Sequence, residues 1–252
     1  GDWSSDVCSS DLDVLKLSQN ELNKLRGARI SMIYQEPMAA LNPAVKIGKQ
    51  VEEVFSLHRP EISAPQRKIE TIQLLEQMKL PTPERIYASY PHQVSGGQCQ
   101  RIVIAMALAC KPDILIADEP TTALDVTTQA EILRLIQDLN EVYDNGTIFI
   151  THDFGIVADI ADRVAVMCQG KIIEQGSKQE ILMHPKEPYT KLLVDAMPLL
   201  ETTRTPDLGR DDKPVLEVKS LHKIYGATST KVHALNDASF VLRKGETLGV
   251  VG

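Results

Sequence analysis

The feature that most constrains the fold is a series of short apolar segments that end in polar residues and alternate with helix-length segments. The clearest are 113–118 (DILIAD) and 147–151 (TIFIT), with the segment 126–143 between them. Short apolar runs bounded by turn residues are typical of buried strands. A strand–helix–strand order favours parallel pairing, with helices on the faces of the sheet. The sequence therefore predicts an α/β protein.

The remaining elements follow from the same patterns. A further strand is predicted at 29–34 (RISMIY), and two short strands at 164–168 and 171–174 are predicted to form a hairpin that turns at Gln169 and Gly170. The predicted helices have apolar residues at helical spacing and span 45–58, 65–80, 96–110, 126–143, 178–183 and 189–196.

The composition divides the chain into four parts. Residues 1–12 (GDWSSDVCSSDL) lack periodicity and the basic start and apolar core of a signal peptide, so we interpret them as a foreign leader. Residues 13–198 carry the α/β pattern. Residues 199–213 are polar and contain proline and glycine, which is typical of a linker. Residues 214–252 are interpreted as the opening of a second domain, with strands at 215–225, 232–242 and 246–252.

The composition also excludes some classes of protein. With 252 residues and 43% hydrophobic residues, the chain can bury a sizeable core. A net charge of -7 argues against a nucleic-acid binder, which needs a clustered basic face. The four cysteines show neither CxxC nor metal-ligand spacing, which favours a reduced, cytosolic protein. No apolar run approaches the ~18 residues of a membrane span, so a membrane role requires partners.

Two acidic residues, Asp118 and Glu119, close the apolar strand at 113–118. Carboxylates at the carboxyl end of a buried parallel strand point into the crevice where α/β sheets bind ligands. The first could hold Mg²⁺ and the second could orient or deprotonate a water. Taken alone, the pair is equally compatible with an ordinary acidic turn before Pro120.

The segment Val94-Ser95-Gly96-Gly97-Gln98 precedes a long apolar helix. Glycines at a helix N-terminus expose backbone N–H groups, and a serine adds a hydroxyl, so the segment suits an anion such as a γ-phosphate. A serine N-cap followed by flexible glycines is the simpler interpretation of this motif alone.

Two further polar residues follow predicted strands. Gln35 comes after 29–34, where it could reach a metal ion or water, and His152 comes after the strand TIFI, where it could reach a phosphate or the attacking water. Alone, each would more simply be a solvated or structural side chain.

The order of these motifs changes their interpretation. The sequence runs YQEP, YPHQVSGGQCQR, ILIADEPTTALD and ITHD, and this set resembles the nucleotide-binding domain of ABC transporters over nearly all of 13–198. The resemblance implies a parallel-sheet core plus a helical subdomain at about 40–110. It also implies that the domain is truncated, and that the first strands of a second such domain follow.

The resemblance assigns roles to residues. It implies that Gln35 is the Q-loop glutamine, a ligand of Mg²⁺ and of the attacking water, and that Asp118 is the Walker B aspartate, which holds Mg²⁺. Glu119 is the implied catalytic glutamate and His152 the switch histidine. The residues implied to contact ATP are the signature Ser95, Gly96, Gly97 and Gln98, the D-loop Asp125, the adenine-stacking Tyr225, and Gly252, where a second P-loop would begin.

One expected motif is absent: the sequence contains no GxxxxGK followed by Ser or Thr. This loop cradles the β- and γ-phosphates in the family. ABC domains pair head to tail, so Ser95 to Gly97 would act on ATP held after Gly252. Gln35, Asp118, Glu119 and His152 would act on ATP held by an upstream loop. We therefore expect the 252-residue chain alone neither to bind ATP tightly nor to hydrolyse it.

The segments YQEPMAALNP, YPHQ and HPKEPYTKLLVDAMP resemble ATPases of the oligopeptide, dipeptide and nickel importer group, and a second ABC start after a linker resembles its tandem members. This implies an ATPase on the cytoplasmic face of the inner membrane. The implied partners are permease subunits, a second ABC domain in cis or in a dimer, and indirectly a solute-binding protein. The transported solute stays open.

Three alternatives remain from the sequence. A soluble tandem ABC protein acting on ribosomes usually has a long, charged helical linker, whereas 199–213 is short. An SMC-type DNA protein needs a long coiled coil between Gln35 and Ser95, and this chain has only a short helical insert there. An inactive scaffold or fragment is the third alternative. In the parent protein, the presence of Glu119 and His152 argues against it.

Overall fold

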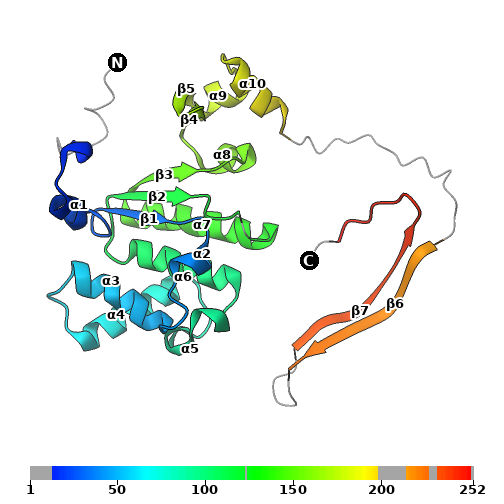
Figure 1. Cartoon of the computed structure of the whole chain (residues 1–252), viewed down its shortest axis with the longest axis horizontal. Helices are drawn as coiled ribbons and strands as arrows, with labels where there is room; N and C mark the ends of the chain where they lie inside the picture. The colour runs from blue at the N-terminus through cyan, green and yellow to red at the C-terminus, as the bar shows by residue number, and fades with distance from the viewer. Residues whose placement is uncertain (1–12, 123, 198–213, 227–231, 251–252) are drawn as a thin grey trace. The chain divides into compact units, whose positions relative to one another are not determined.

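The structure, a computed structural model, describes residues 13–122, 124–197, 214–226 and 232–250 (Figure 1). The predicted leader at 1–12 and linker at 199–213 lie outside these residues, as does Gly252. The chain divides into two units, Gly1–Met197 and Pro198–Gly252, which are described separately.

A three-stranded parallel sheet forms the centre of the first unit. Its strands β1 (Ile30–Ile33), β2 (Ile114–Asp118) and β3 (Gly146–Ile150) lie in the order β1-β2-β3. Ile116 of β2 pairs with Met32 on one side and with Ile148 on the other. The predicted strands are confirmed to within one residue at most ends. Because all three strands are parallel, the residues that follow them meet at one edge of the sheet.

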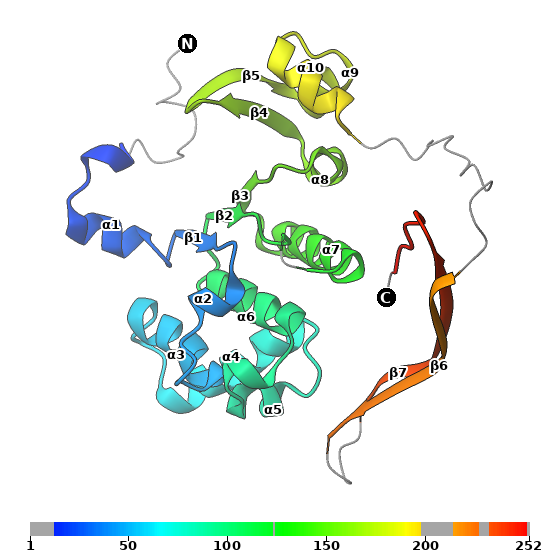
Figure 2. The same ribbon diagram turned by 45° about the vertical axis from the view of Figure 1, so that its right-hand side comes forward.

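Helices pack along one side of this sheet (Figures 1 and 2). The helices α6 (Gly96–Leu108) and α7 (Val126–Tyr143) share one buried cluster with Ile33 and Leu115 of the sheet. Each fully buried Leu or Ile contributes about 1.5–3 kcal/mol to folding. The apolar stripe of α7 that joins this cluster consists of Ile132, Leu135, Ile136 and Leu139.

A group of helices precedes α6 in the chain. It consists of α2 (Pro37–Ala40), α3 (Ile47–His58), α4 (Ala64–Gln77) and α5 (Pro83–Ala88). α4 begins as the sequence indicates, with Ser63 as N-cap and Pro65 in its first turn, where the missing N–H of proline costs nothing. The short helices α2 and α5 were not predicted. Four residues give α2 no readable period, and the six residues of α5 show none, although the six-residue helix at 178–183 was predicted.

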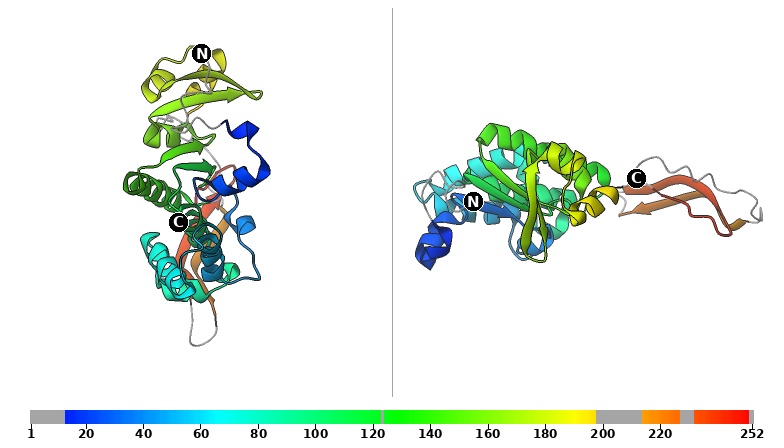
Figure 3. Two further views of the ribbon diagram at one scale, coloured as in Figure 1. Left: turned by 90° about the vertical axis from the view of Figure 1, so that its left-hand side faces the viewer. Right: turned by 90° about the horizontal axis from the view of Figure 1, so that it is seen from above.

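The chain leaves the sheet through α8 (Phe154–Ile160) and then forms an antiparallel hairpin (Figure 3). Its strands are β4 (Arg163–Cys168) and β5 (Lys171–Ser177). The predicted turn is confirmed: Gln169 and Gly170 both have positive φ, at 48° and 77°, as a two-residue hairpin turn requires. The helices α9 (Lys178–Met183) and α10 (Pro188–Asp195) follow.

Two short elements that the sequence did not predict lie at the start of the described chain. These are the 3-10 helix η1 (Val14–Lys16) and the helix α1 (Gln19–Leu25), and a second 3-10 turn, η2 (Pro91–Gln93), precedes α6. Ser18 and Glu21 form a capping box at the start of α1, which satisfies N–H groups that a helix leaves unpaired. Within the described residues, no helix is both long and apolar enough to cross a membrane.

The second unit is a hairpin of β6 (Pro214–Tyr225) and β7 (Val232–Arg243). These strands confirm two of the three predicted there. The predicted strand at 246–252 was wrong over its described part, because residues 246–250 have no regular secondary structure. A strand needs a partner for its backbone groups, and an apolar run does not supply one.

Candidate functional site

Glu119 lies at the centre of the site, directly after β2. Its φ is +44°, a left-handed conformation that is uncommon outside glycine and costs about 1–3 kcal/mol. The position is held from both sides, since the Glu119 N–H donates to the Ile150 carbonyl at 2.9 Å and Pro120 follows. Strain of this kind persists only where the surrounding structure enforces it, and it clusters at functional sites.

Three side chains converge on the Glu119 carboxylate. The Gln35 amide donates to Oε2 at 2.7 Å, the Thr122 hydroxyl donates to Oε2 at 3.0 Å, and His152 Nδ1 lies 3.0 Å from Oε1. Gln35 follows β1 and His152 follows β3, so the three parallel strands bring these groups to one edge of the sheet. The sequence-predicted Gln35, Glu119 and His152 are therefore in contact.

These contacts keep Glu119 ionised. The bond from His152 is the largest cause that lowers the pKa of the Glu119 carboxyl below its usual range, and the bond from Thr122 is the next. The side chain is 23% exposed, so water can reach it. A carboxylate that is ionised and accessible to water can position a water molecule as a nucleophile.

The contact with Glu119 also indicates which ring nitrogen of His152 carries a proton. An ionised carboxylate only accepts hydrogen bonds, so Nδ1 of His152 carries a proton. The other ring nitrogen, Nε2, then either accepts a hydrogen bond or, in the charged form, donates one. Because the His152 side chain is 72% exposed, this nitrogen is accessible to a ligand.

Asp118 and Gln35 line one cavity of about 430 Å³ beside the Glu119 cluster. The amide group of Gln35 donates to Glu119, which leaves its oxygen as the atom able to ligate a cation. Mg²⁺ is commonly bound by one or two protein oxygens together with water and substrate phosphates. These two donors fit that pattern, although the described residues include no group of three or more His, Cys, Asp or Glu suited to a metal ion.

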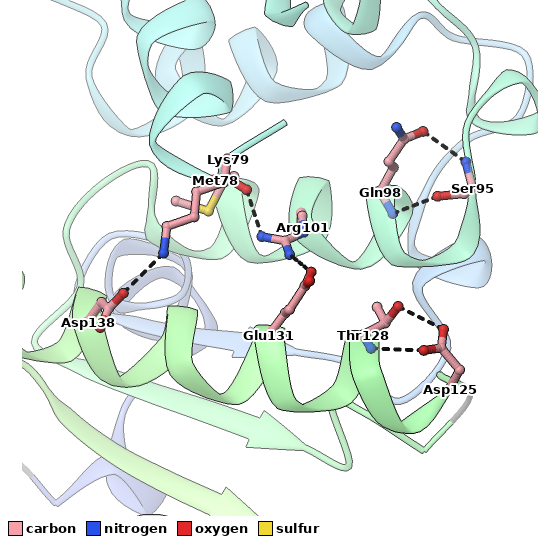
Figure 4. Close-up of polar contacts among 9 residues, drawn as sticks. All are labelled: Met78, Lys79, Ser95, Gln98, Arg101, Asp125, Thr128, Glu131 and Asp138. Atoms are coloured by element: carbon pink, nitrogen blue, oxygen red, sulfur yellow. Dashed lines mark hydrogen bonds and ion pairs between the residues drawn. The ribbon is translucent and has the colours of Figure 1, made fainter. Parts of the chain in front are cut away.

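The signature residues form the start of α6 (Figure 4). Ser95 is the N-cap, and a capping box joins it to Gln98: the Gln98 N–H donates to Ser95 Oγ at 3.3 Å, and the Ser95 N–H donates to Gln98 Oε1 at 3.0 Å. The hydroxyl of Ser95 is an acceptor in this pair, so its own proton remains available for an anion. Nothing lies within 4 Å of a Cβ built on Gly96.

Asp125 has the equivalent position at the start of α7. Its carboxylate accepts from the Thr128 N–H at 2.9 Å and from the Thr128 hydroxyl at 2.7 Å. The backbone bond from Thr128 is the main cause that lowers the pKa of the Asp125 carboxyl. A Cβ built on Gly97 would lie 2.7 Å from Thr128 Cγ2, so the first turns of α6 and α7 approach closely because residue 97 is glycine.

The comparisons with known proteins agree with this arrangement. A model of the ABC transporter family matches residues 10–122, and a model of the oligopeptide/dipeptide transporter C-terminal region matches residues 173–224. A dimeric structure of the ATP-binding cassette MJ0796 bound to ADP and Pi is 30% identical. It superposes with a TM-score of 0.59 over 67% of this chain and 71% of that chain.

The chain belongs to the ABC transporter family.

A second dimeric structure of MJ0796 is 32% identical with a TM-score of 0.57, over 64% of this chain and 68% of that one. The predicted ABC-type α/β fold is thereby confirmed. The match of residues 173–224 to the oligopeptide/dipeptide transporter C-terminal region agrees with the predicted importer group. Among curated relatives, the glutathione import ATP-binding protein GsiA of Salmonella choleraesuis is 41% identical over 96% of this chain, and GsiA of Shigella dysenteriae is 42% identical over 95%. The chain spans 43% and 44% of the length of these two ABC proteins.

Tyr225 and Gly252 belong to the other unit. Tyr225 ends β6, is 59% exposed, and has the Lys223 ammonium 5.1 Å from its ring centre. The Lys223 ammonium is therefore within cation–π distance of the Tyr225 ring. Gly252 lies outside the described residues.

Sequence reasoning missed the bond from Thr122 to Glu119. Thr122 is not among the site residues that the sequence predicts. The available signal was local: the Thr122 N–H also donates to the Glu119 carbonyl at 3.3 Å, which makes Glu119 to Thr122 a tight turn through Pro120. Such a turn brings the side chains of its first and fourth residues within reach of each other.

Proposed function

We propose that this chain is the ATP-hydrolysing region of an ABC importer, acting with ATP and Mg²⁺. The observation that carries the proposal is the ionised Glu119 carboxylate, held in a strained conformation by Gln35, Thr122 and His152. Such a group is suited to activate the water that attacks a γ-phosphate.

In this proposal each of four residues has its own role: Glu119, His152, Gln35 and Asp118. Glu119 accepts a hydrogen bond from the attacking water and orients or deprotonates it. His152 holds Glu119 through Nδ1 and uses Nε2 toward the transferred phosphoryl group. Gln35 donates to Glu119 through its NH2 group and lines the cavity with Asp118, so its amide oxygen would be available to a cation there. Asp118 and Gln35 would hold Mg²⁺, which neutralises charge on the phosphates.

A second set of residues would act on a second nucleotide. Ser95, Gly96 and Gly97 offer a hydroxyl and backbone N–H groups at the positive end of a helix, which suits the γ-phosphate of ATP held by another ABC domain. Gln98 fixes this turn through its capping box, and Asp125 begins the adjacent helix. Tyr225 would stack on adenine, and Gly252 would begin the loop that holds the phosphates. This division assigns 13–198 and 214–252 to two ABC domains.

The permease is proposed to dock beside α3. An apolar cavity of about 420 Å³ is lined there by Val54, Leu57 and His58, and Tyr34 and Ala40 line both this cavity and the one that holds Gln35. A partner helix seated against Leu57 would therefore contact the residue next to Gln35. Docked to its permease, the protein would lie on the cytoplasmic face of the inner membrane.

The docking surface can be tested with matched substitutions. Leu57 is 68% exposed and Leu192 on α10 is 67% exposed. We expect Leu57→Asp to abolish co-purification with the permease subunits of the importer, and Leu192→Asp to leave it intact. Equal loss from both variants would contradict docking at α3.

The solute is proposed to be glutathione or a short peptide. The supporting observations are the family of the C-terminal region, named for oligopeptide and dipeptide transport, and the curated relatives named for glutathione import. The test uses the complete protein that the gene encodes, reconstituted with its permease and solute-binding protein in vesicles. ATP hydrolysis stimulated by glutathione or by a dipeptide supports the proposal. Hydrolysis that neither solute changes refutes the solute, and the absence of all hydrolysis refutes the activity.

A further inference from the structure

Arg101 links three helices of the first unit (Figure 4). It lies on α6, one turn beyond Gln98, and its side chain is only 11% exposed. Its Nη1 donates to the Met78 carbonyl at 3.0 Å, and its Nη2 lies 2.7 Å from Glu131 Oε2 on α7. The planar guanidinium can hold both acceptors at once, which a lysine ammonium on a flexible stem does less well.

The contact with Met78 satisfies the end of α4. Met78 is the C-cap of that helix, and the last carbonyls of a helix have no partner within it. A positive charge is also favoured at this negative end of the helix dipole. Arg101 thereby attaches α4, in the helical group, to the helix that carries the signature residues.

The contact with Glu131 joins α6 to α7 at a second point. The first point is the close approach of Gly97 and Thr128, where a Cβ on residue 97 would lie 2.7 Å from Thr128 Cγ2. Gly97 and Arg101 are one turn apart on α6, and Thr128 and Glu131 are one turn apart on α7. Two contacts on one face of each helix fix their relative rotation as well as their separation.

We propose that Arg101 is a positioning residue that holds the signature turn at Ser95 and the D-loop turn at Asp125 as one rigid body. The two turns begin the helices that Arg101 and Glu131 connect, so a nucleotide contact at Ser95 moves Asp125 with it. The hydrogen bond from Arg101 to the Met78 carbonyl connects this rigid body to α4. The inference rests on the proposed function for its consequence, but the rigid connection is testable without any hydrolysis.

The structure supplies a matched control. Lys79, next to Met78, pairs with Asp138 of α7 at 3.3 Å, so it also bridges the end of α4 to α7. Among the described residues, Lys79, unlike Arg101, has no hydrogen bond or ion pair with α6, and the side chains of Lys79 and Asp138 are both more than half exposed. Replacing either cation by glutamine removes one charge and one bridge to α7. Only the change at residue 101 removes a contact of the signature helix.

The first measurement is amide hydrogen exchange on the complete protein that the gene encodes. In Arg101→Gln, exchange of the peptides 95–101 and 125–131 is expected to rise roughly 2- to 30-fold, the range found for residues that carry coupling through packed networks. Lys79→Gln should leave both peptides unchanged. No local rise in Arg101→Gln, an equal rise throughout the chain, or the same rise in Lys79→Gln would overturn the proposal.

The second measurement is ATP hydrolysis by variants on both sides of the contact between Arg101 and Glu131. Arg101→Gln and Glu131→Gln should each lower turnover, and the double variant should be no slower than the slower single one, because both remove one interaction. Arg101→Lys should recover part of the activity. Additive losses would overturn the link through Glu131. If the unmodified protein hydrolyses no ATP, the proposed function fails. The exchange result still tests whether Arg101 holds the turns at Ser95 and Asp125 together.

Discussion

The Gln35 amide donates a 2.7 Å hydrogen bond to Glu119, a residue 84 positions later in the chain. Both residues follow neighbouring parallel strands, so their contact is a consequence of the sheet order β1-β2-β3. The same order brings His152 to the other carboxylate oxygen. A movement of the segment after β1 must therefore alter the hydrogen bonding of the residue proposed to activate water.

The Glu119→Gln variant tests the proposed role of this carboxylate. An amide has nearly the same shape but cannot act as a base, so kcat for ATP hydrolysis by the complete protein should fall roughly 10²- to 10⁴-fold while ATP binding remains. Phosphate release and nucleotide binding are measured on the same preparation. Glu84→Gln, which removes an exposed carboxylate on α5, is the control and should keep full activity. Activity retained in Glu119→Gln would exclude Glu119 as the base.

The pKa of Glu119 should depend on His152. The bond from His152 is the largest cause that lowers this pKa, so His152→Ala should move it up toward the ordinary range of a glutamic acid. Because the pKa of Glu119 is lower in the folded than in the unfolded protein, ionised Glu119 stabilises the fold. This contribution is complete above the ordinary pKa of a glutamic acid and is lost as the pH falls through the lowered pKa. The measurement is the pH titration of the Glu119 carboxyl carbon by NMR. An unchanged titration in His152→Ala, or the same shift in the control His184→Ala, would contradict this assignment.

Local patterns were sufficient for most of the central elements. The prediction for 126–143 matches α7 at both ends, because the helix begins at an aspartate cap and carries an uninterrupted apolar stripe. The strand predicted at 246–252 failed over its described part, residues 246–250, because apolar residues without a pairing partner do not form a strand. The four residues of α2 are too few for a period to show, whereas the six residues of α9 were sufficient and those of α5 were not.

The site was only partly predictable. Strand ends indicated Gln35, Asp118 and His152, because the geometry of a parallel sheet gathers such positions. The link from Arg101 to Glu131 depends on how α6 and α7 cross, and no local pattern encodes that crossing. The strained backbone of Glu119 was equally unreadable, since a glutamate before proline normally indicates an extended residue.

Gly48 should be intolerant of any side chain. A Cβ built there would lie 2.1 Å from the Tyr87 ring, between α3 and α5. Gly48→Ala is therefore expected to lower the free energy of unfolding by about 1–3 kcal/mol through overpacking. In Gly96→Ala, by contrast, the new methyl group meets open space, so stability should hold or rise slightly. Urea unfolding of both variants is the measurement, and equal stabilities would contradict the close packing of Gly48 against Tyr87.

Glu174 connects the β4–β5 hairpin to α10. Its carboxylate accepts from the Lys186 N–H at 2.8 Å and from the Glu187 N–H at 3.1 Å, just before the first turn of that helix. Backbone N–H groups at a helix start have no partner within the helix, and a carboxylate there is favoured by the helix dipole.

Replacing Glu174 by alanine should therefore cost about 0.5–2 kcal/mol, as the loss of a helix cap does. The loss should be local, so amide exchange is expected to rise in the peptide 184–195 while the central sheet keeps its protection. Glu187→Ala is the matched control, because its side chain makes no cap hydrogen bond to α10. If Glu187→Ala loosened α10 as much as Glu174→Ala does, general charge rather than the two backbone bonds would hold this helix to β5.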